Sequence, residues 1–462
     1  MSEDSPQRIW APAAWLPDGW RHGVLLDVDR RGCWGAIRTD QARVPDALCL
    51  DGPLIPGVVN SHSHAFQRGF AGRTERREGA HDDFWSWREQ MYGLALRVSP
   101  AQLEAIATQL YVELLEGGYT HVCEFHYLHH DRDGSPFADP HAMMRALAAA
   151  AVSTGIGLTI LPVLYERAGF TESHLSERQR RFRSSVSEVL AMRDAARRWG
   201  EPLISAGTAI HSLRAASASS VQALARMIRD DPGPVHIHIA EQRAEVRDCL
   251  ASTGLSPVAW LDRNVTLDAR WHLVHATHVE ASEQDAIACA RAGVVVCPTT
   301  EADLGDGRFD LDGFSNRGIG VSIGSDSHVC RSWMQEVRLL EYSQRLSLER
   351  RNVAARPDSD RPSSAEAVLE VALPAGARAA GLGERWGLAE GARADAVELE
   401  CNAAGLLGIP ADAALDAAVF ASDSPPVKAV WVAGRLRVKR GSHLQRDRAA
   451  SGFRAALGEL AA

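Results

Sequence analysis

Eight short apolar runs recur along the middle of the chain, separated by longer segments in which apolar residues follow a helical spacing. This alternation is typical of strand–helix units whose parallel strands are joined by crossover helices. Eight such units are the number that closes a parallel barrel, so this pattern constrains the fold more than any other feature. The expected strands cover residues 54–61, 119–125, 157–164, 203–210, 235–240, 270–275, 293–297 and 319–324.

The segment after the first apolar run carries the signals that begin and end a helix. Ser99 and Gln102 match a capping box, and Pro100 suits the first turn. Gly117 and Gly118 end the segment. Further helices are expected over residues 141–153, 177–198, 221–229, 244–261, 282–292 and 333–347.

The two ends of the chain lack the strand–helix alternation. Short apolar runs lie between turn residues there, and residues 449–460 have the spacing of an amphipathic helix. We therefore expect an α/β protein in which a (β/α)8 TIM barrel spans residues 53–386. A small β-sandwich domain, formed from both termini, is expected to take residues 1–52 and 387–462, with the terminal helix in its second part.

The charge balance argues against several kinds of partner. The chain has 50 basic and 59 acidic side chains, a formal charge of -9, and no basic block for nucleic acid or an anionic membrane. It begins without a hydrophobic signal segment and has no apolar run of membrane-spanning length, so we expect a cytoplasmic protein. Its eight cysteines show no Cys-x-x-Cys spacing, which argues against a zinc finger or a disulfide framework.

Five side chains suited to metal binding or acid–base chemistry stand at the ends of predicted strands. His62 and His64 lie two residues apart, so on an extended strand both imidazoles point to the same side. His238, His275 and Asp326 each end another apolar run. Because parallel barrels gather their active sites at the carboxyl ends of the strands, we expect these groups to converge around one metal ion.

The lysine content favours a single ion. Lys428 and Lys439 are the only lysines, and both lie near the C-terminus, far from the histidine motifs. Related hydrolases with two ions often bridge them with a carbamylated lysine on a middle strand, and this chain has none there. We expect a mononuclear zinc site, although iron and manganese accept similar ligands.

These side chains fit hydrolytic chemistry. A zinc-type ion held by three imidazoles and a carboxylate lowers the pKa of a bound water from 15.7 to about 7. Asp326 is placed both to ligate the ion and to accept the proton of that water. Glu241, three residues beyond His238, is expected to act as general acid and base. His275 is expected to stabilise the oxygen that becomes negative during attack.

Other polar residues have more ordinary interpretations. His236 shares a strand face with His238 and is expected to fill a deeper layer of the barrel. His278 and His328 are expected to lie beside the site or at the surface. The arginine cluster over residues 178–181 is expected to be a solvated helix face.

With these residues in order, the chain resembles the amidohydrolase superfamily, in particular its mononuclear deaminases. Longer strings narrow the resemblance to the formimidoylglutamate deiminase family: NSHSHAFQR at 60–68, FWSWRE at 84–89, CEFHYLHH at 123–130, HSLR at 211–214 and PTTEADLGDG at 298–307. The resemblance implies a zinc-dependent homodimer that hydrolyses N-formimino-L-glutamate to N-formyl-L-glutamate and ammonia, a step of histidine degradation.

Carried over position by position, the resemblance implies a role for each matching residue. The implied metal ligands are His62, His64, His238 and Asp326, and the implied proton-transfer pair is Glu241 and His275. The implied substrate contacts are Gln67, Arg88, Tyr127, His211 and Arg214. The two arginines suit a glutamate derivative, because planar guanidinium groups bind carboxylates through two parallel hydrogen bonds.

Two other functions stay open at this point. A deaminase of the same branch that acts on a heterocycle such as guanine or cytosine needs aromatic stacking, for which Trp85 and Trp87 are candidates. A non-catalytic scaffold on the same barrel is the other alternative. Such proteins usually lose metal ligands, whereas this chain retains the whole set.

Overall fold

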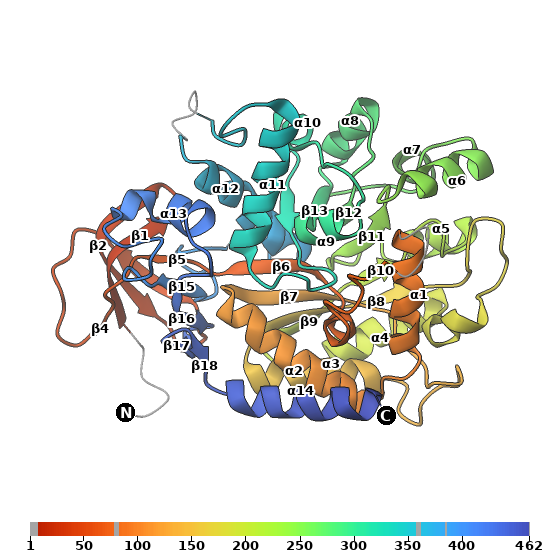
Figure 1. Ribbon diagram of the computed structural model, residues 1–462, viewed down its shortest axis with the longest axis horizontal. Coiled ribbons are helices and arrows are strands. Elements are labelled where there is room, and N and C mark those ends of the chain that lie inside the picture. Colours follow the sequence, from red (N-terminus) through yellow and green to blue (C-terminus); the bar gives the residue numbers. More distant parts are fainter. Residues whose placement is uncertain (1–7, 78–82, 357–361, 384–385, 462) are drawn as a thin grey trace.

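A barrel of parallel strands occupies the centre of the computed structural model, which describes residues 8–77, 83–356, 362–383 and 386–461 (Figure 1). Its strands are β6 (Val58–Ser63), β7 (Tyr119–His126), β8 (Gly157–Leu164), β9 (Ile204–Ala206), β10 (Thr208–Ile210), β11 (Val235–Ile239), β12 (Trp271–His275), β13 (Gly293–Val296) and β14 (Val321–Ile323). Gly207 separates β9 from β10, which together fill one strand position next to β8. The predicted (β/α)8 barrel is therefore confirmed.

Main-chain hydrogen bonds between the first and last strand positions close the barrel at its carboxyl end. The carbonyl oxygen of His62 accepts from the amides of Ser325 and Asp326, at 3.1 and 3.0 Å. The amide of His64 donates to the carbonyl oxygen of Asp326 at 3.3 Å. Closure thus joins the two chain segments that carry three of the four predicted metal ligands.

Helices cover the outside of the barrel, as the sequence predicted. They are α2 (Pro100–Glu116), α3 (Ala142–Thr154), α4 (Val186–Arg197), α5 (Ala218–Met227), α6 (Arg243–Thr253), α7 (Pro257–Asn264), α8 (Ala281–Ala290), α11 (Trp333–Leu348) and α12 (Ser364–Ala379). Both hydrogen bonds of the predicted capping box between Ser99 and Gln102 are present. None of the helices in the described part of the chain is both long and apolar enough to cross a membrane.

Further helical elements follow the carboxyl ends of the strands and surround the barrel mouth. They are η1 (Ala65–Gly69), α1 (Phe84–Ala95), η2 (Glu177–Phe182), α9 (Pro298–Asp303) and α10 (Leu311–Asn316). The predicted helix over residues 177–198 is in fact two elements, because the chain is extended between η2 and α4. The predicted helix over residues 244–261 is also two helices, because Gly254, with a positive φ of 76°, ends α6 before α7 begins. Several predicted substrate contacts lie on these mouth elements.

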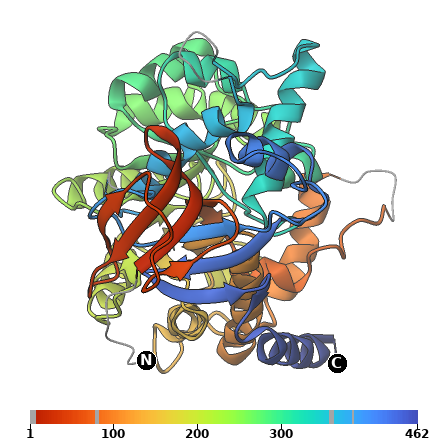
Figure 2. The ribbon, with the colours of Figure 1, turned by 90° about the vertical axis from the view of Figure 1, so that its left-hand side faces the viewer.

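A second sheet combines both ends of the chain into the predicted small β domain (Figure 2). Its strands are β1 (Arg8–Leu16), β2 (Gly19–Val28), β3 (Trp34–Arg38), β4 (Leu48–Cys49), β5 (Leu54–Pro56), β15 (Ala396–Leu399), β16 (Val427–Val432), β17 (Arg435–Lys439) and β18 (Ser442–His443). Apolar side chains from both termini share one core, which includes Ile9, Leu26, Trp34, Ala396 and Trp431. Helix α13 (Ala414–Phe420) packs beside α11 and α12.

The junction between the two sheets lies inside the first predicted barrel strand. β5 pairs with β1 and β15 of the small domain, whereas β6, which begins two residues later, belongs to the barrel. We propose Gly57 as the domain boundary, since it separates these strands; the predicted division at 386–387 stays a prediction. The terminal helix α14 (Arg446–Ala461) lies along α2 of the barrel, where Gln102 donates to Glu459 (Figure 1).

One residue of the arginine cluster over residues 178–181, Arg181, departs from the predicted solvated position, whereas Arg178 is exposed as predicted. Arg181 is fully buried, and its guanidinium donates to the carbonyl oxygens of His130 at 2.8 Å, of Val98 at 2.9 Å, and of Ala95. The side chain therefore fastens the chain at the end of α1 to the loop after β7. Burial lowers the pKa of Arg181 to about 10, which still leaves it charged at neutral pH.

Replacing Arg181 with leucine is expected to lower the free energy of unfolding by about 3 kcal/mol, because three buried carbonyl oxygens lose their donor. Urea denaturation measures this change. The matched control is Arg178→Leu, which removes an exposed ion pair with Glu89 and is expected to change stability by less than about 1 kcal/mol. Equal effects of the two substitutions would contradict the structural role of Arg181.

Candidate metal centre and active site

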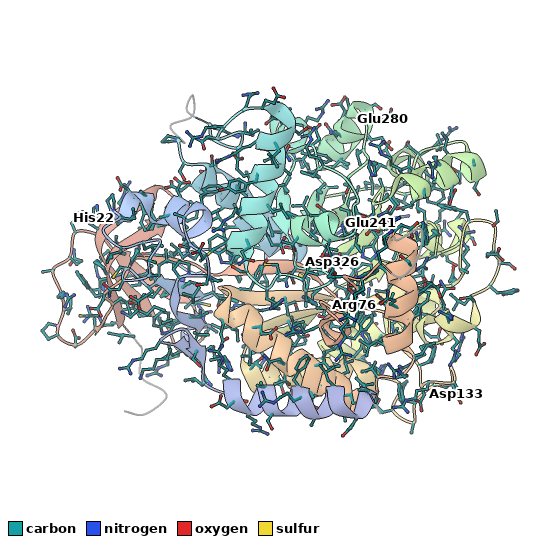
Figure 3. The ribbon with its side chains drawn as sticks, in the orientation of Figure 1. His22, Arg76, Asp133, Glu241, Glu280 and Asp326 are labelled. Carbon is teal, nitrogen blue, oxygen red and sulfur yellow. The ribbon has the colours of Figure 1, made fainter. Side chains whose placement is uncertain are left out.

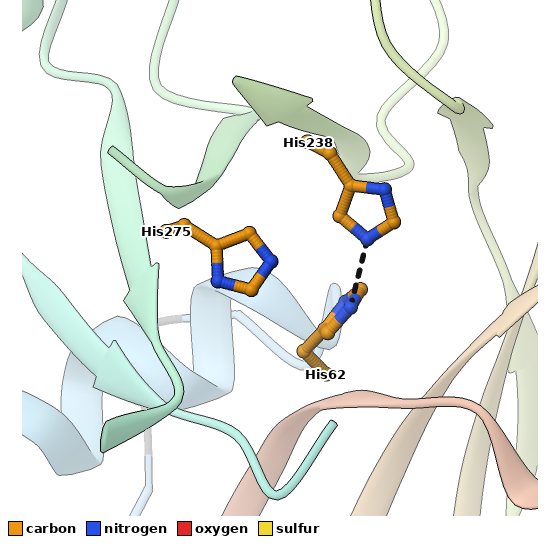
Figure 4. Close-up of side chains that lie close together, drawn as sticks. All are labelled: His62, His238 and His275. Carbon is orange, nitrogen blue, oxygen red and sulfur yellow. Dashed lines mark hydrogen bonds between the residues drawn. The ribbon is translucent and has the colours of Figure 1, made fainter. Parts of the chain in front are cut away.

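Four predicted metal ligands meet at the barrel mouth. His62 and His64 come from the end of β6, His238 from β11, and Asp326 from the turn after β14. The Nε2 atoms of His62 and His238 are 3.0 Å apart (Figure 4). The Asp326 carboxylate lies 3.4 Å from His62 Nε2 and 3.3 Å from His64 Nε2.

The measured distances between donor atoms suit a divalent metal ion. A tetrahedral zinc ion with bonds of about 2.0–2.1 Å holds its ligand atoms about 3.3 Å apart, close to the three distances given above. The donor atoms form two groups within 4.8 Å, His62 with His64 and Asp326, and His62 with His238 and His275, so His62 joins the two groups. Burial lowers the pKa of His62 to about 3 and also lowers the pKa values of His64 and His238. Neutral imidazoles keep a lone pair for the metal, so the donor chemistry agrees with the geometry.

The Asp326 side chain supplies the negative charge of the site. Burial by itself would raise the pKa of Asp326, but hydrogen bonding and charge from His62, and the charge of His64, lower it below its ordinary value. The group is therefore a carboxylate at neutral pH. Figure 3 shows Asp326 near the centre of the molecule, close to Glu241.

Contacts behind the ligands fix how they point. The Nδ1–H group of His64 donates to the carbonyl oxygen of Phe125 at 3.0 Å, which leaves Nε2 free to ligate. The buried Glu124 carboxyl accepts from Ser63 Oγ at 2.7 Å and from the amide of Ala65 at 2.6 Å. Both neighbours of His64 are thereby held to strand β7.

The turns at the mouth hold their residues in an uncommon backbone conformation. Ala240, His275, Ala276, Asp326 and His328 all have positive φ angles, between 45° and 70°. Each such residue costs about 1–3 kcal/mol and persists only where the surrounding structure imposes it. Clustering of these residues after β11, β12 and β14 indicates that the geometry of this mouth is maintained at an energetic cost.

Glu241 and His275, the predicted proton-transfer pair, lie beside the predicted metal ligands. Glu241 Oε1 lies 3.6 Å from His275 Nε2, which is also 3.9 Å from Asp326 Oδ2. Burial raises the pKa of Glu241 to about 7. Burial would lower the pKa of His275, but the Glu241 and Glu301 carboxylates raise it to about 10, so the imidazole is protonated at neutral pH.

The predicted substrate contacts also gather at the mouth. Gln67 Nε2 donates to the Tyr127 hydroxyl at 3.2 Å. The His211 ring lies 5.1 Å from the His238 ring, measured between centroids. The guanidinium carbons of Arg88 and Arg214 lie 5.5 and 5.3 Å from the centroid of the Trp85 ring, so one indole supports both arginines.

Comparison with known proteins assigns the family. The model of the amidohydrolase family matches residues 54–437. The chain belongs to the amidohydrolase family. It is 44% identical over 457 residues to the Pseudomonas aeruginosa protein named formimidoylglutamate deiminase, a match that covers 98% of this chain and 99% of that protein.

Solved structures agree with the assignment. A crystal structure of an amidohydrolase from Brucella melitensis has a TM-score of 0.93 at 42% identity and covers 99% of this chain and 100% of that chain. A zinc-bound structure of an adenosine deaminase from Xanthomonas campestris has a TM-score of 0.80 at 20% identity, covering 99% of this chain and 100% of that chain. At that identity the second likeness shows the fold alone.

Two residues of this amidohydrolase site were not singled out in the sequence. Glu301 on α9 accepts from His275 Nδ1 at 3.2 Å, and its carboxylate also accepts from the amide of Cys297 at 2.8 Å. Tyr165, directly after β8, accepts from Arg88 Nη2 at 2.9 Å. The position of Tyr165 at a strand end was an available signal, whereas nothing local marks Glu301 as a partner of His275.

The histidines predicted to lie outside the metal set do so. His236 Nε2 donates to the carbonyl oxygen of Ala379 deep in the barrel, at 2.8 Å. His278 Nε2 donates to the carbonyl oxygen of Asp306 at 2.7 Å. His328 is fully buried behind the ligands, where Nε2 lies 3.3 Å from Ser63 Oγ.

Replacing His238 with alanine is expected to reduce metal affinity at least about tenfold, because an ion at this site loses one of four ligands. Metal content per chain, measured on purified protein by mass spectrometry, reports this loss. His236→Gln is the matched control on the same strand and is expected to retain the metal content of the wild type. Equal metal content in the His238 variant and the wild type would reject this ligand.

Proposed function

We propose that this amidohydrolase is a formimidoylglutamate deiminase, which hydrolyses N-formimino-L-glutamate to N-formyl-L-glutamate and ammonia in histidine degradation. The 44% identity to the protein of that name supports the proposal. We further propose one zinc ion per chain, held by His62, His64, His238 and Asp326. Assembly as a homodimer and a cytoplasmic location stay predictions of the sequence.

The burial of two arginines that have no carboxylate in direct contact is the observation that carries the proposal. Arg88 and Arg214 are only 8% and 7% exposed, yet neither has a carboxylate within ion-pair distance in the described ranges. The charge of Arg214 acts on Glu241 and Glu245 from a greater distance, and its Nε has no hydrogen-bond partner there. A buried guanidinium without a contacting carboxylate is costly, and a ligand carboxylate would offset that cost. A substrate with two carboxylates supplies a partner for each guanidinium.

The polar groups around these arginines suit a carboxylate ligand. Arg88 donates to the Tyr165 hydroxyl, which also accepts from Gln179 Nε2 at 2.9 Å. The Tyr165 ring lies 4.3 Å from that of His211, between centroids, which in turn contacts the metal ligand His238. Carboxylate recognition and the metal centre are therefore linked by direct contacts.

The acid–base pair has a defined task in this reaction. A divalent metal held by His62, His64, His238 and Asp326 would make hydroxide available near neutral pH. Glu241 accepts one proton of the attacking water and delivers it to the nitrogen that leaves as ammonia, and Asp326 accepts the second proton of that oxygen as the C–N bond breaks. The protonated His275, placed between these two carboxylates, donates to the oxygen that becomes negative on the formimino carbon.

Deamination of a heterocycle is less well supported. Trp85 already packs against both buried guanidiniums, and the Trp87 ring lies 5.6 Å from that of Phe70 and 6.3 Å from that of Phe84. Both tryptophans therefore contact side chains of the protein, and Trp85 is also 36% exposed. Their contacts support the interpretation that they hold the arginines in place.

Ammonia release tests the proposed function directly. The purified, zinc-loaded protein is expected to release ammonia from N-formimino-L-glutamate, because the two carboxylates of this substrate pair with Arg88 and Arg214. Guanine, cytosine and adenosine, assayed in parallel, lack these carboxylates and are expected to release none above background. Release from a heterocycle alone would contradict the proposal.

The raised pKa of Glu241 sets the pH dependence. Below about pH 7 the Glu241 carboxyl group is already protonated, so it cannot accept a proton from the attacking water. We therefore expect kcat/KM, measured over a range of pH, to fall as the pH falls through this value.

Glu241→Gln is expected to lower kcat by about 10³-fold while metal content stays unchanged. A Glu241 variant that keeps near wild-type turnover, and the same fall in kcat/KM at low pH, would refute the role of Glu241 in proton transfer.

A further inference from the structure

Asp306 is a buried carboxyl group at the barrel mouth that the proposed mechanism leaves without a task. It lies in the loop between α9 and α10 and is 4% exposed. Its amide donates to the carbonyl oxygen of Glu301 at 2.9 Å, and its carbonyl oxygen accepts from His278 Nε2 at 2.7 Å. The position of the residue is thus fixed by its main chain.

The side chain of Asp306 faces the acid–base pair. Its Oδ1 atom accepts a hydrogen bond from Gln242, the residue after Glu241. Its Oδ2 atom is buried and has no hydrogen-bond partner within the described ranges. Polar atoms of Asp306, Glu241 and His275 all lie within 4.8 Å of one another. The Asp306 carboxyl group, one oxygen of which has no partner in this part of the chain, therefore lies beside Glu241 and His275.

The charges around this point do not balance within the protein. Three carboxyl groups, those of Glu241, Glu301 and Asp306, surround the single imidazolium of His275. Burial, followed by the neighbouring Glu241, raises the pKa of Asp306 to about 10. Without a ligand, Asp306 therefore keeps its proton at neutral pH. A second cation beside Glu241 and Asp306 would let both carboxyl groups ionise.

We propose that Asp306 is a specificity-determining residue, which together with Glu241 accepts hydrogen bonds from the N–H groups of a cationic amidinium in the substrate. The inference rests on the proposed function and names its substrate class. That class is a zwitterion with a planar cation at the metal end and two carboxylates at the arginine end.

An amidinium fits both carboxylates for geometric reasons. An amidine is a strong base that carries its proton at neutral pH, and its two nitrogens present N–H groups in one plane, as a guanidinium does. Glu241 and Asp306 approach from different loops and offer one acceptor each. An amide or an uncharged heterocycle brings no positive charge to compensate these carboxylates.

Two ligands with the same dicarboxylate but a charged or a neutral planar group test the role of Asp306. N-amidino-L-glutamate carries a planar cation, whereas N-formyl-L-glutamate carries a neutral amide on the same dicarboxylate. Titration calorimetry of the zinc-loaded protein measures both dissociation constants. Asp306→Asn is expected to weaken the cationic ligand about tenfold or more, the loss of a charge-assisted hydrogen bond, and to change the neutral one by less than about twofold.

The matched control is Asp310→Asn, in the same loop region. Asp310 caps α10 by accepting from the amide of Gly313 at 3.2 Å, and its variant is expected to bind both ligands as the wild type does. Equal weakening of both ligands by Asp306→Asn would overturn the inference and make Asp306 structural. A fall in zinc content in that variant would overturn it as well, since Asp306 would then support the metal.

The assay of the wild type separates this inference from the proposed function. A wild type that releases ammonia from N-formimino-L-glutamate, together with an Asp306 variant that does not discriminate between the ligands, rejects only the role of Asp306. A wild type that releases none rejects the proposed function, and the inference falls with it.

Discussion

The rest of the site depends on the hydrogen bonds that close the barrel between β6 and β14. The carbonyl oxygen of His62 accepts from two successive amides, and His64 returns one bond to Asp326. These bonds set the distance between ligands that are more than two hundred residues apart in the sequence. A metal ion that binds all four ligands therefore stabilises the closed barrel, because the open chain has no comparable site.

Charge is divided across the mouth in a way that suits the proposed substrate, which carries two carboxylates and a planar cation. Carboxylates and imidazoles surround the metal end, whereas Arg88 and Arg214 both contact the Trp85 ring at the other end. Each buried charge needs a partner from the ligand, the metal or the protein. The arrangement consequently favours a bound molecule that satisfies several such groups at once over one that satisfies a single group.

Much of the fold and the central chemistry was predictable because strand ends are visible in the sequence. All eight strand positions follow from short apolar runs, and parallel strands place their carboxyl ends together, so His62, His238 and Asp326 had to approach one another. The break at Gly207 was missed, since it depends on a close approach: a Cβ there would lie 2.4 Å from the carbonyl oxygen of Pro234. The switch of β5 to the other sheet is likewise a long-range pairing.

Residues that act through partners on other loops were harder to find. Glu301 reaches His275, and Arg181 reaches three carbonyl oxygens, only because loops distant in sequence fold against each other. Composition made Arg181 look like part of a solvated cluster, and burial reversed that interpretation. Local periodicity reports which face of an element is apolar, but not which buried polar groups will meet.

Zinc K-edge X-ray absorption on the zinc-loaded protein tests the central claim most directly, namely that one ion is held by three imidazoles and one carboxylate. The predicted spectrum shows nitrogen and oxygen neighbours at about 2.0–2.1 Å, imidazole multiple scattering, and no second metal. A sulfur neighbour at about 2.3 Å, or a metal–metal distance of about 3.5–4 Å, would contradict this account of the site.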